Sequence, residues 1–147
     1  MINYQSDVVI DRPVEQAFRL ASDVARMDEW TDMMGTQLVA GSTLGVGAQI
    51  KTILNMGPLK QAMTFEVTEF EPNRRLGFKS VSKGALHWDA LYSFEAHGPS
   101  STRMTSAGVL RLNGFLKLLE PLMAGEVKSG EAKELVKFKD LVEAQPA

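Results

Sequence analysis

Two side chains capable of acid–base chemistry lie close together in the segment GALHWDALYSFEA, which covers residues 84–96. His87 and Asp89 share one face of the β-strand that this alternating pattern predicts, and Tyr92 falls on the other face. An imidazole beside a carboxylate can move a proton, and a tyrosine hydroxyl can orient a carbonyl or hydroxyl group of a ligand. These three residues are therefore the candidates for catalysis.

Each of these candidates has a structural alternative. The face that carries His87 and Asp89 also carries Glu95, which favours a solvent-facing pair unless a β-bulge turns His87 toward a cavity mouth. A buried tyrosine usually finds a hydrogen-bond partner within the protein, and this is the alternative for Tyr92.

Other common catalytic and cofactor patterns find no support in the chain. Asp28 and Glu29 are adjacent on a predicted helix and point about 100° apart, which predicts solvated carboxylates rather than an acid–base pair. Ser42 and Ser106 lack a histidine–acid pair that would activate them. The chain has no cysteine and two distant histidines, so we expect no metal site. GSTLGVG lacks the GxGxxG spacing and a following helix, and we expect no cofactor.

The other face of the 84–96 segment is apolar and is the best candidate for ligand binding. It carries large aromatic side chains such as Trp88 beside the small Ala90, and Ser106 and Gly108 are small residues on the next segment. Small residues on a concave face leave space, which predicts a pocket. The alternative is a solid core in which they accommodate a close helix. The predicted lining consists of Trp30, Met63, Phe65, Phe78, Trp88, Ala90, Tyr92, Phe94, Met104, Ser106, Gly108, Leu122 and Met123.

The elements that position these residues follow from hydrophobic periodicity. Short turns such as MGPL (56–59), PNRR and HGPSS separate alternating segments, so neighbouring strands are expected to pair antiparallel. Between the first strand and Trp30, the sequence predicts two short helices, the second of which is capped by Asp23. The segments predicted as strands are 4–10, 36–41, 49–56, 59–71, 75–82, 84–96 and 102–112.

Residues 114–143 have apolar side chains at helical spacing, which predicts one long amphipathic helix. Pro121 lacks an amide hydrogen, so a break or kink is expected there. Lysines and acids alternate in the stretch KSGEAKELVKFKD, and this mixture predicts a solvated helix face. The apolar stripe of this helix is the largest surface left to cover the sheet, so the sheet is expected to wrap around it.

Three stretches carry a resemblance to a known family: VEQAFRLASD with the following EW (14–30), FEVTEFEPNRRLGFK (65–79) and YSFEAHGPSSTRMT (92–105). Together with the order of elements, they resemble the START-like superfamily, in its polyketide cyclase/dehydrase and SRPBCC-type branch. The resemblance covers essentially the whole chain. Its usual G-G-T hairpin is replaced here by Pro99-Ser100-Ser101-Thr102, and the chain shows no residue set shared with the catalytic members.

The resemblance implies an α+β helix-grip fold. This fold is a strongly curved antiparallel sheet of about seven strands wrapped around a long C-terminal helix, with two short helices between the first two strands. Such proteins commonly hold an apolar cavity between the sheet and the terminal helix. The resemblance therefore implies that the aromatic face of residues 84–96 borders a cavity.

Composition limits the partners. A length of 147 residues suits one domain, 1–147, and a formal net charge of −2 argues against nucleic acid. No apolar run approaches the roughly 18 residues of a membrane span, and MINYQSDVV lacks the pattern of a signal peptide. The absence of cysteine fits a cytoplasmic protein. We expect a monomer or homodimer whose partner is a small hydrophobic ligand.

Three functions remain open at this level. The favoured one is a binding or carrier protein for a small hydrophobic molecule, such as a lipid, an isoprenoid quinone or a polyketide-like aromatic. The second is a cyclase or dehydratase in which Tyr92 orients the substrate and His87 or Asp89 moves the proton. The third is an interaction module linked to a chaperone or the ribosome, which predicts an exposed apolar patch.

Overall fold

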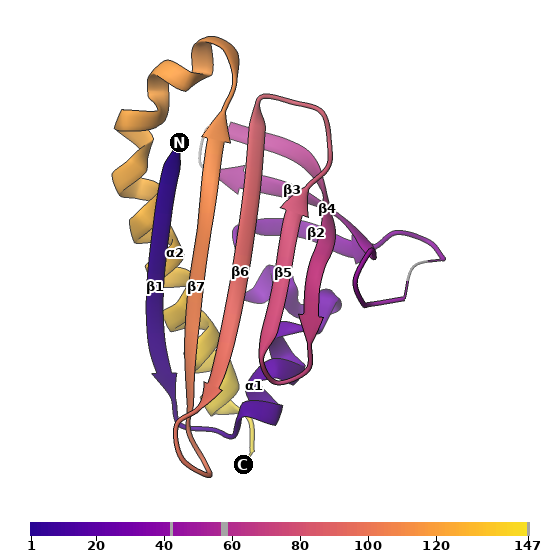
Figure 1. The fold of residues 1–147 in the computed structure, drawn as a ribbon, viewed down its shortest axis with the longest axis vertical. Helices are drawn as coiled ribbons and strands as arrows, with labels where there is room; N and C mark the ends of the chain where they lie inside the picture. The colour runs from indigo at the N-terminus through magenta and orange to yellow at the C-terminus, as the bar shows by residue number, and fades with distance from the viewer. Residues whose placement is uncertain (42, 57–58, 147) are drawn as a thin grey trace.

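The computed structural model describes residues 1–41, 43–56 and 59–146 and has the expected helix-grip architecture (Figure 1). Strand β1 (Ile2–Ile10) leads into helix α1 (Val14–Ala21) and the 3₁₀-helix η1 (Val24–Glu29). The chain ends with the 3₁₀-helix η2 (Gly114–Leu119) and the long helix α2 (Glu120–Ala144). The other strands are β2 (Met33–Leu38), β3 (Gln49–Met56), β4 (Leu59–Glu71), β5 (Arg75–Ser80), β6 (Leu86–Ala96) and β7 (Thr102–Leu112).

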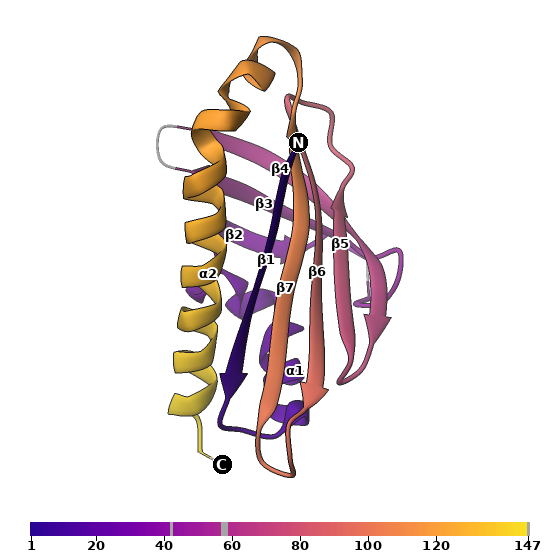
Figure 2. The ribbon, with the colours of Figure 1, turned by 60° about the vertical axis from the view of Figure 1, so that its left-hand side comes forward.

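Among the described residues, seven strands form one antiparallel sheet in the order β1-β7-β6-β5-β4-β3-β2. The sheet is strongly curved, so that β2, β3 and the first part of β4 cross behind the upright strands β6 and β5 (Figure 1). The pairing register shifts between Met34 and Gln37 in β2 and between Val67 and Glu69 in β4. Such bulges bend a strand, and both lie in the half of the sheet that turns away. Helix α2 runs along β1 and closes the concave side (Figure 2).

The core has two parts. The Phe138 cluster joins α1, η1, the sheet and the C-terminal half of α2, and it includes Trp30, Phe94 and Leu135. The Leu110 cluster lies toward the N-terminal half of α2 and includes Tyr4, Phe65 and Val127. Phe138 and Leu110 are fully buried, so each cluster is closed to solvent at its centre.

The break expected near Pro121 is confirmed, and it takes the form of a change of helix type. Residues 114–119 form η2, and Pro121 lies in the first turn of α2 instead of within a continuous helix. Proline is tolerated there because the first amide groups of a helix have no intrahelical acceptor. The change of helix type turns the preceding apolar side chains outward: Phe115 and Leu118 are each 79% exposed. Leu122 is 78% exposed, so its predicted place in the cavity lining is wrong.

Two sequence interpretations fall outside the described part of the chain. The turn expected at 56–59 contains Gly57 and Pro58, and the serine considered as a nucleophile is Ser42. Within the described ranges, no helix combines the length and the apolar character needed to cross a bilayer.

Candidate functional site

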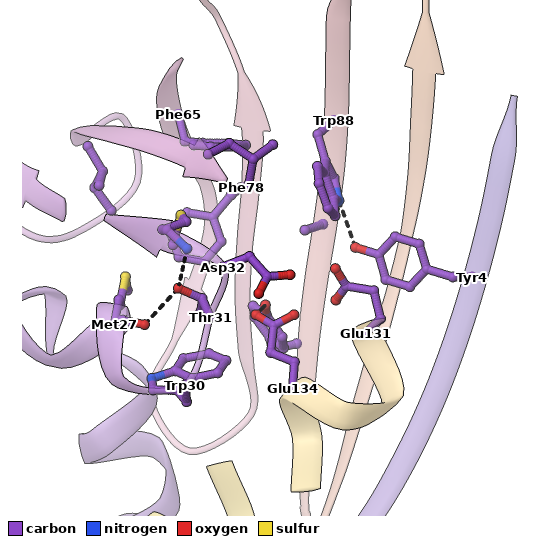
Figure 3. A pocket seen from close by; sticks show the side chains of 15 residues that line it. Tyr4, Met27, Trp30, Thr31, Asp32, Phe65, Phe78, Trp88, Glu131 and Glu134 are labelled. Carbon is purple, nitrogen blue, oxygen red and sulfur yellow. Dashed lines mark hydrogen bonds between the residues drawn. The ribbon is translucent and has the colours of Figure 1, made fainter. Parts of the chain in front are cut away.

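A cavity lies between the sheet and α2, where the Phe138 and Leu110 clusters meet (Figure 3). Its volume is about 70 Å³. An apolar cavity of roughly 150 Å³ binds benzene, so the enclosed space here is smaller than one ring needs and a ring-sized ligand must extend through the opening. Asp32 belongs to the lining and is solvent-exposed, so the cavity is not sealed and a ligand can extend outward.

Six of the residues predicted to bind a ligand line this cavity. They come from the C-terminal end of η1 and from the strands β4, β5 and β6, and five of the six are aromatic. Their contact with a ligand stays a prediction, since the structure establishes only their position. These residues are Trp30, Phe65, Phe78, Trp88, Ala90 and Tyr92.

The remaining predicted lining residues lie elsewhere. Phe94 packs edge-on against Phe18 with ring centroids 5.3 Å apart, within the solid Phe138 cluster that also contains Met104. Met63 is buried in the Leu110 cluster, and Met123 packs against its edge. At these positions the core is filled by the chain itself, as the solid-core alternative predicted. Ser106 is buried as well, 1% exposed, without lining the cavity.

Gly108 leaves space on the concave face of the sheet, as predicted, but the side chain of Tyr4 fills this space. A Cβ atom at Gly108 would lie 2.3 Å from the Tyr4 hydroxyl oxygen and 2.5 Å from the Asp89 carbonyl oxygen. The Tyr4 hydroxyl reaches this place because Gly108 is its partner across the β1–β7 ladder. There it accepts a hydrogen bond of 2.7 Å from Trp88 Nε1. The glycine thus holds Tyr4 and Trp88 at the cavity wall.

Replacing Gly108 by alanine is therefore expected to destabilise the fold by about 1–3 kcal/mol, in the range of overpacked core sites. The variant should also shift the tryptophan emission, because the bond between Tyr4 and Trp88 must lengthen. Gly125→Ala is the matched control: no atom lies within 4 Å of the added Cβ, and alanine in a helix gains about 1 kcal/mol over glycine. Urea unfolding of both variants checks this pair, and equal stabilities would contradict the close approach at Gly108.

Two carboxylates that the sequence analysis assigned to a solvated face also line the cavity. Glu131 and Glu134 are one helical turn apart on α2, and Glu131 is only 7% exposed. The Tyr92 hydroxyl donates a long hydrogen bond of 3.4 Å to Glu134 Oε1. Figure 3 shows both glutamate carboxyl groups pointing into the same space as that of Asp32.

The spacing of Glu131 and Glu134 along α2 indicates that both face the core. Glu131 is four residues from both Val127 and Leu135, which are buried, and Glu134 is four residues before the buried Phe138. Residues four apart share a helix face. Both glutamates therefore belong to the apolar stripe, although the mixture of lysines and acids around them predicted a solvated face.

Burial sets the protonation of this cluster. It raises the pKa of Glu134 well above its ordinary value, and the neighbouring charge of Glu131 adds to the effect. Burial also raises the pKa of Glu131, while a hydrogen bond with Glu134 opposes the rise. The same burial, with the charge of Glu134, raises the pKa of the Tyr92 hydroxyl. The glutamate pair therefore retains a proton at pH values where exposed carboxyl groups are ionised.

The other acid–base candidates of the sequence do not reach the cavity. His87 is half-buried and Asp89 is exposed on the opposite face of β6 from Trp88, and neither lines the cavity. The pairing of β6 with β7 runs through both residues without a register shift, so no bulge in this ladder turns His87 inward. A role for His87 or Asp89 in moving a proton inside this cavity is therefore wrong.

The adjacent acids near the end of η1 have separate structural partners. The Asp28 carboxylate accepts a hydrogen bond of 2.7 Å from the Gly35 amide and another from the Thr36 hydroxyl. Glu29 pairs with Arg26 at 2.7 Å on the surface. They are not an acid–base pair, in agreement with the sequence analysis.

The chain belongs to the polyketide cyclase / dehydrase and lipid transport family, because its sequence matches that family over residues 1–143. No curated protein matches the sequence.

Solved structures show the same fold at low sequence identity. A protein from Thermus thermophilus is 19% identical, with a TM-score of 0.82 over 99% of both chains. The ZhuI aromatase/cyclase from Streptomyces sp. R1128 is 11% identical, with a TM-score of 0.75 over 96% of this chain and 93% of that chain. Norcoclaurine synthase from Thalictrum flavum, solved with dopamine and hydroxybenzaldehyde, is 12% identical, with a TM-score of 0.71 over 99% and 88%. Identities this low show a shared fold alone.

Proposed function

We propose that this protein binds a small, mainly apolar molecule in the cavity between the sheet and α2. The observation that carries the proposal is an open space with aromatic walls, formed by Trp30, Phe65, Phe78 and Trp88. A mainly apolar pocket with a few converging polar groups is the usual form of a small-molecule site. The family's description, which includes lipid transport, supports the same class of function. We expect the protein to act in the cytoplasm.

The charge of the cavity limits the polar end of the ligand. Within the described residues, the lining contains no lysine, arginine or histidine, whereas Asp32, Glu131 and Glu134 all contribute carboxyl groups. A carboxylate or phosphate needs cationic or amide donors and would be repelled by these acids. The proposal therefore favours ligands without an anionic group and disfavours free fatty acids.

A cyclase or dehydratase is the second candidate, and one observation favours it. Glu134 lies in an apolar cavity, contacts the Tyr92 hydroxyl and has a raised pKa, which is the setting of a general acid. In this role Tyr92 and Glu134 would act on a bound carbonyl, in place of His87 or Asp89.

Filling the cavity tests the binding proposal. Ala90 lines it, so Ala90→Leu places an isobutyl group in the free space. Both tryptophans of the chain, Trp30 and Trp88, line the cavity, so a bromine-containing ligand such as 4-bromobenzyl alcohol should quench their fluorescence in a saturable way. We expect Ala90→Leu to weaken this binding at least tenfold.

Ala62→Leu is the matched control, because Ala62 is exposed on β4 and does not line the cavity. It should bind the alcohol as the unmodified chain does. Equal binding by the Ala90→Leu variant and the unmodified chain would place the ligand outside this cavity.

A further inference from the structure

Three carboxyl groups from two distant segments of the chain converge on the cavity. Asp32 lies between η1 and β2, and Glu131 and Glu134 lie on α2 (Figure 3). In the described part of the chain, no salt bridge involves any of the three, and the six that exist lie elsewhere. Glu131 is buried, and the lining residues that the structure describes include no lysine, arginine or histidine that could donate to it.

Such an arrangement is unfavourable for the protein alone. Buried carboxylates are normally paired with a cation or saturated with donors, because removing a charge from water costs several kcal/mol. The donors of the lining are few. The Tyr92 hydroxyl is directed at Glu134, Trp88 Nε1 at Tyr4 and the Thr31 hydroxyl at the Met27 carbonyl, and Trp30 Nε1 bonds to neither glutamate. A proton shared by the two glutamates still leaves one negative charge between them, and Asp32 adds a second at the cavity mouth.

Aromatic rings border the same space as the acids. Trp30 and Tyr92 meet edge to face, with centroids 5.5 Å apart, and Phe78 meets Tyr92 in the same way at 6.4 Å. Ring faces attract cations, most strongly when water is excluded, and tryptophan is the best such partner. Aromatic walls with unpaired acids thus form a cavity that suits a positively charged group and an apolar body together.

We infer that the ligand of this cavity is an amine, whose protonated nitrogen binds between Glu131, Glu134 and Asp32 while its apolar or aromatic body lies against Phe65, Phe78 and Trp88. The inference rests on the proposed function and deepens it by naming the ligand class. A neutral ligand whose carbonyl accepts a proton from Glu134 is the competing occupant, and it would leave the remaining negative charge unmatched.

The test compares three probes of nearly equal size and different charge at pH 7. These are 4-bromobenzylamine, which is a cation, 4-bromobenzyl alcohol, which is neutral, and 4-bromobenzoate, which is an anion. Their dissociation constants are read from quenching of Trp30 and Trp88. We expect the amine to bind at least tenfold more tightly than the alcohol, and the benzoate to bind most weakly, since a hydrogen-bonded ion pair in a partly buried site has this effect.

A double variant, Glu131→Gln with Glu134→Gln, connects the preference to the two acids. It keeps the shape of both side chains and should weaken amine binding at least tenfold, so that the ratio of amine to alcohol affinity falls toward one. Glu126→Gln on the exposed face of the same helix is the control and should change neither. Binding of the alcohol by the double variant also shows that its cavity is intact, and the ratio of amine to alcohol affinity in the unmodified chain decides the question even if that variant does not fold.

The outcomes separate this inference from the proposed function. If the alcohol or the benzoate binds as tightly as the amine, the amine inference is overturned and the proposed binding function stands. If none of the three probes quenches in a saturable way, the proposed function and the inference fail together.

Discussion

Replacing Phe138 by alanine is expected to lower the free energy of unfolding by about 3–5 kcal/mol, the range found for fully buried aromatic residues. Phe138 has no exposed surface and packs edge-on against Trp30, with ring centroids 4.8 Å apart. Its ring connects α2 to the segment that ends η1, so its removal leaves a void beside a wall of the cavity. Urea unfolding, followed by circular dichroism, measures the loss.

Val136→Ala is the control for this experiment. Val136 is two residues away on the same helix and 53% exposed, and surface substitutions usually change stability by about 0.5 kcal/mol or less. A loss below about 1 kcal/mol for Phe138→Ala would show that α2 does not pack on Trp30 as described.

The second large effect is a pH-dependent gain in stability when Glu131 and Glu134 are both replaced by glutamine. Both carboxyl groups have raised pKa values in the folded state, chiefly because of burial. The folded chain therefore binds protons more tightly than the unfolded chain, whose glutamates titrate near a pH of about 4.3. By linkage, the stability that these protons contribute to the unmodified protein is fully present below that pH and is lost as the pH rises through the folded-state values.

Glutamine cannot titrate, so the double variant escapes this loss. Near pH 4 we expect the free energies of unfolding of the double variant and the unmodified protein to differ only by a constant offset. Near pH 8 we expect this difference to have shifted by about 1–3 kcal/mol in favour of the double variant. Chemical unfolding at a series of pH values gives the difference, and Glu126→Gln should show no such trend. An unmodified protein that gains stability over the double variant as the pH rises would reveal a cationic partner for the pair.

Much of the fold follows from local pattern. Alternating segments separated by turns such as PNRR predicted the strands, and the short connections predicted antiparallel neighbours. The path of the chain near Pro121 could not be predicted in the same way, because an apolar spacing near 3.6 is compatible with a kinked helix and with a 3₁₀ segment followed by an α-helix. Only the packing of α2 on β1 decides which leucines are buried, and it leaves Leu118 and Leu122 outside.

The candidate site could also be predicted only in part from the sequence. Strand alternation placed Trp88, Ala90 and Tyr92 on the cavity side, because the period of a strand is independent of the rest of the fold. Glu131 and Glu134 were predicted to lie on a solvated face because they are charged. Their spacing, however, places them in the buried stripe of Val127 and Leu135.

Pairings between distant parts of the chain were also beyond the local pattern. The neighbour of Gly108 is Tyr4, which comes from the other end of the sequence, so the space beside this glycine is filled by a residue that no short motif connects to it. Asp32 reaches the acids of α2 only because the sheet curls around the helix.

A crystal structure of the protein with 4-bromobenzyl alcohol tests the central claim, an accessible space between the sheet and α2, most directly. The anomalous signal of bromine locates the ring without interpretation of weak density. The account predicts a peak inside the cavity, among Phe65, Phe78 and Trp88, with the hydroxyl directed toward Glu134. A crystal whose aromatic side chains fill this space, with bromine absent from it at saturating alcohol, would contradict the account.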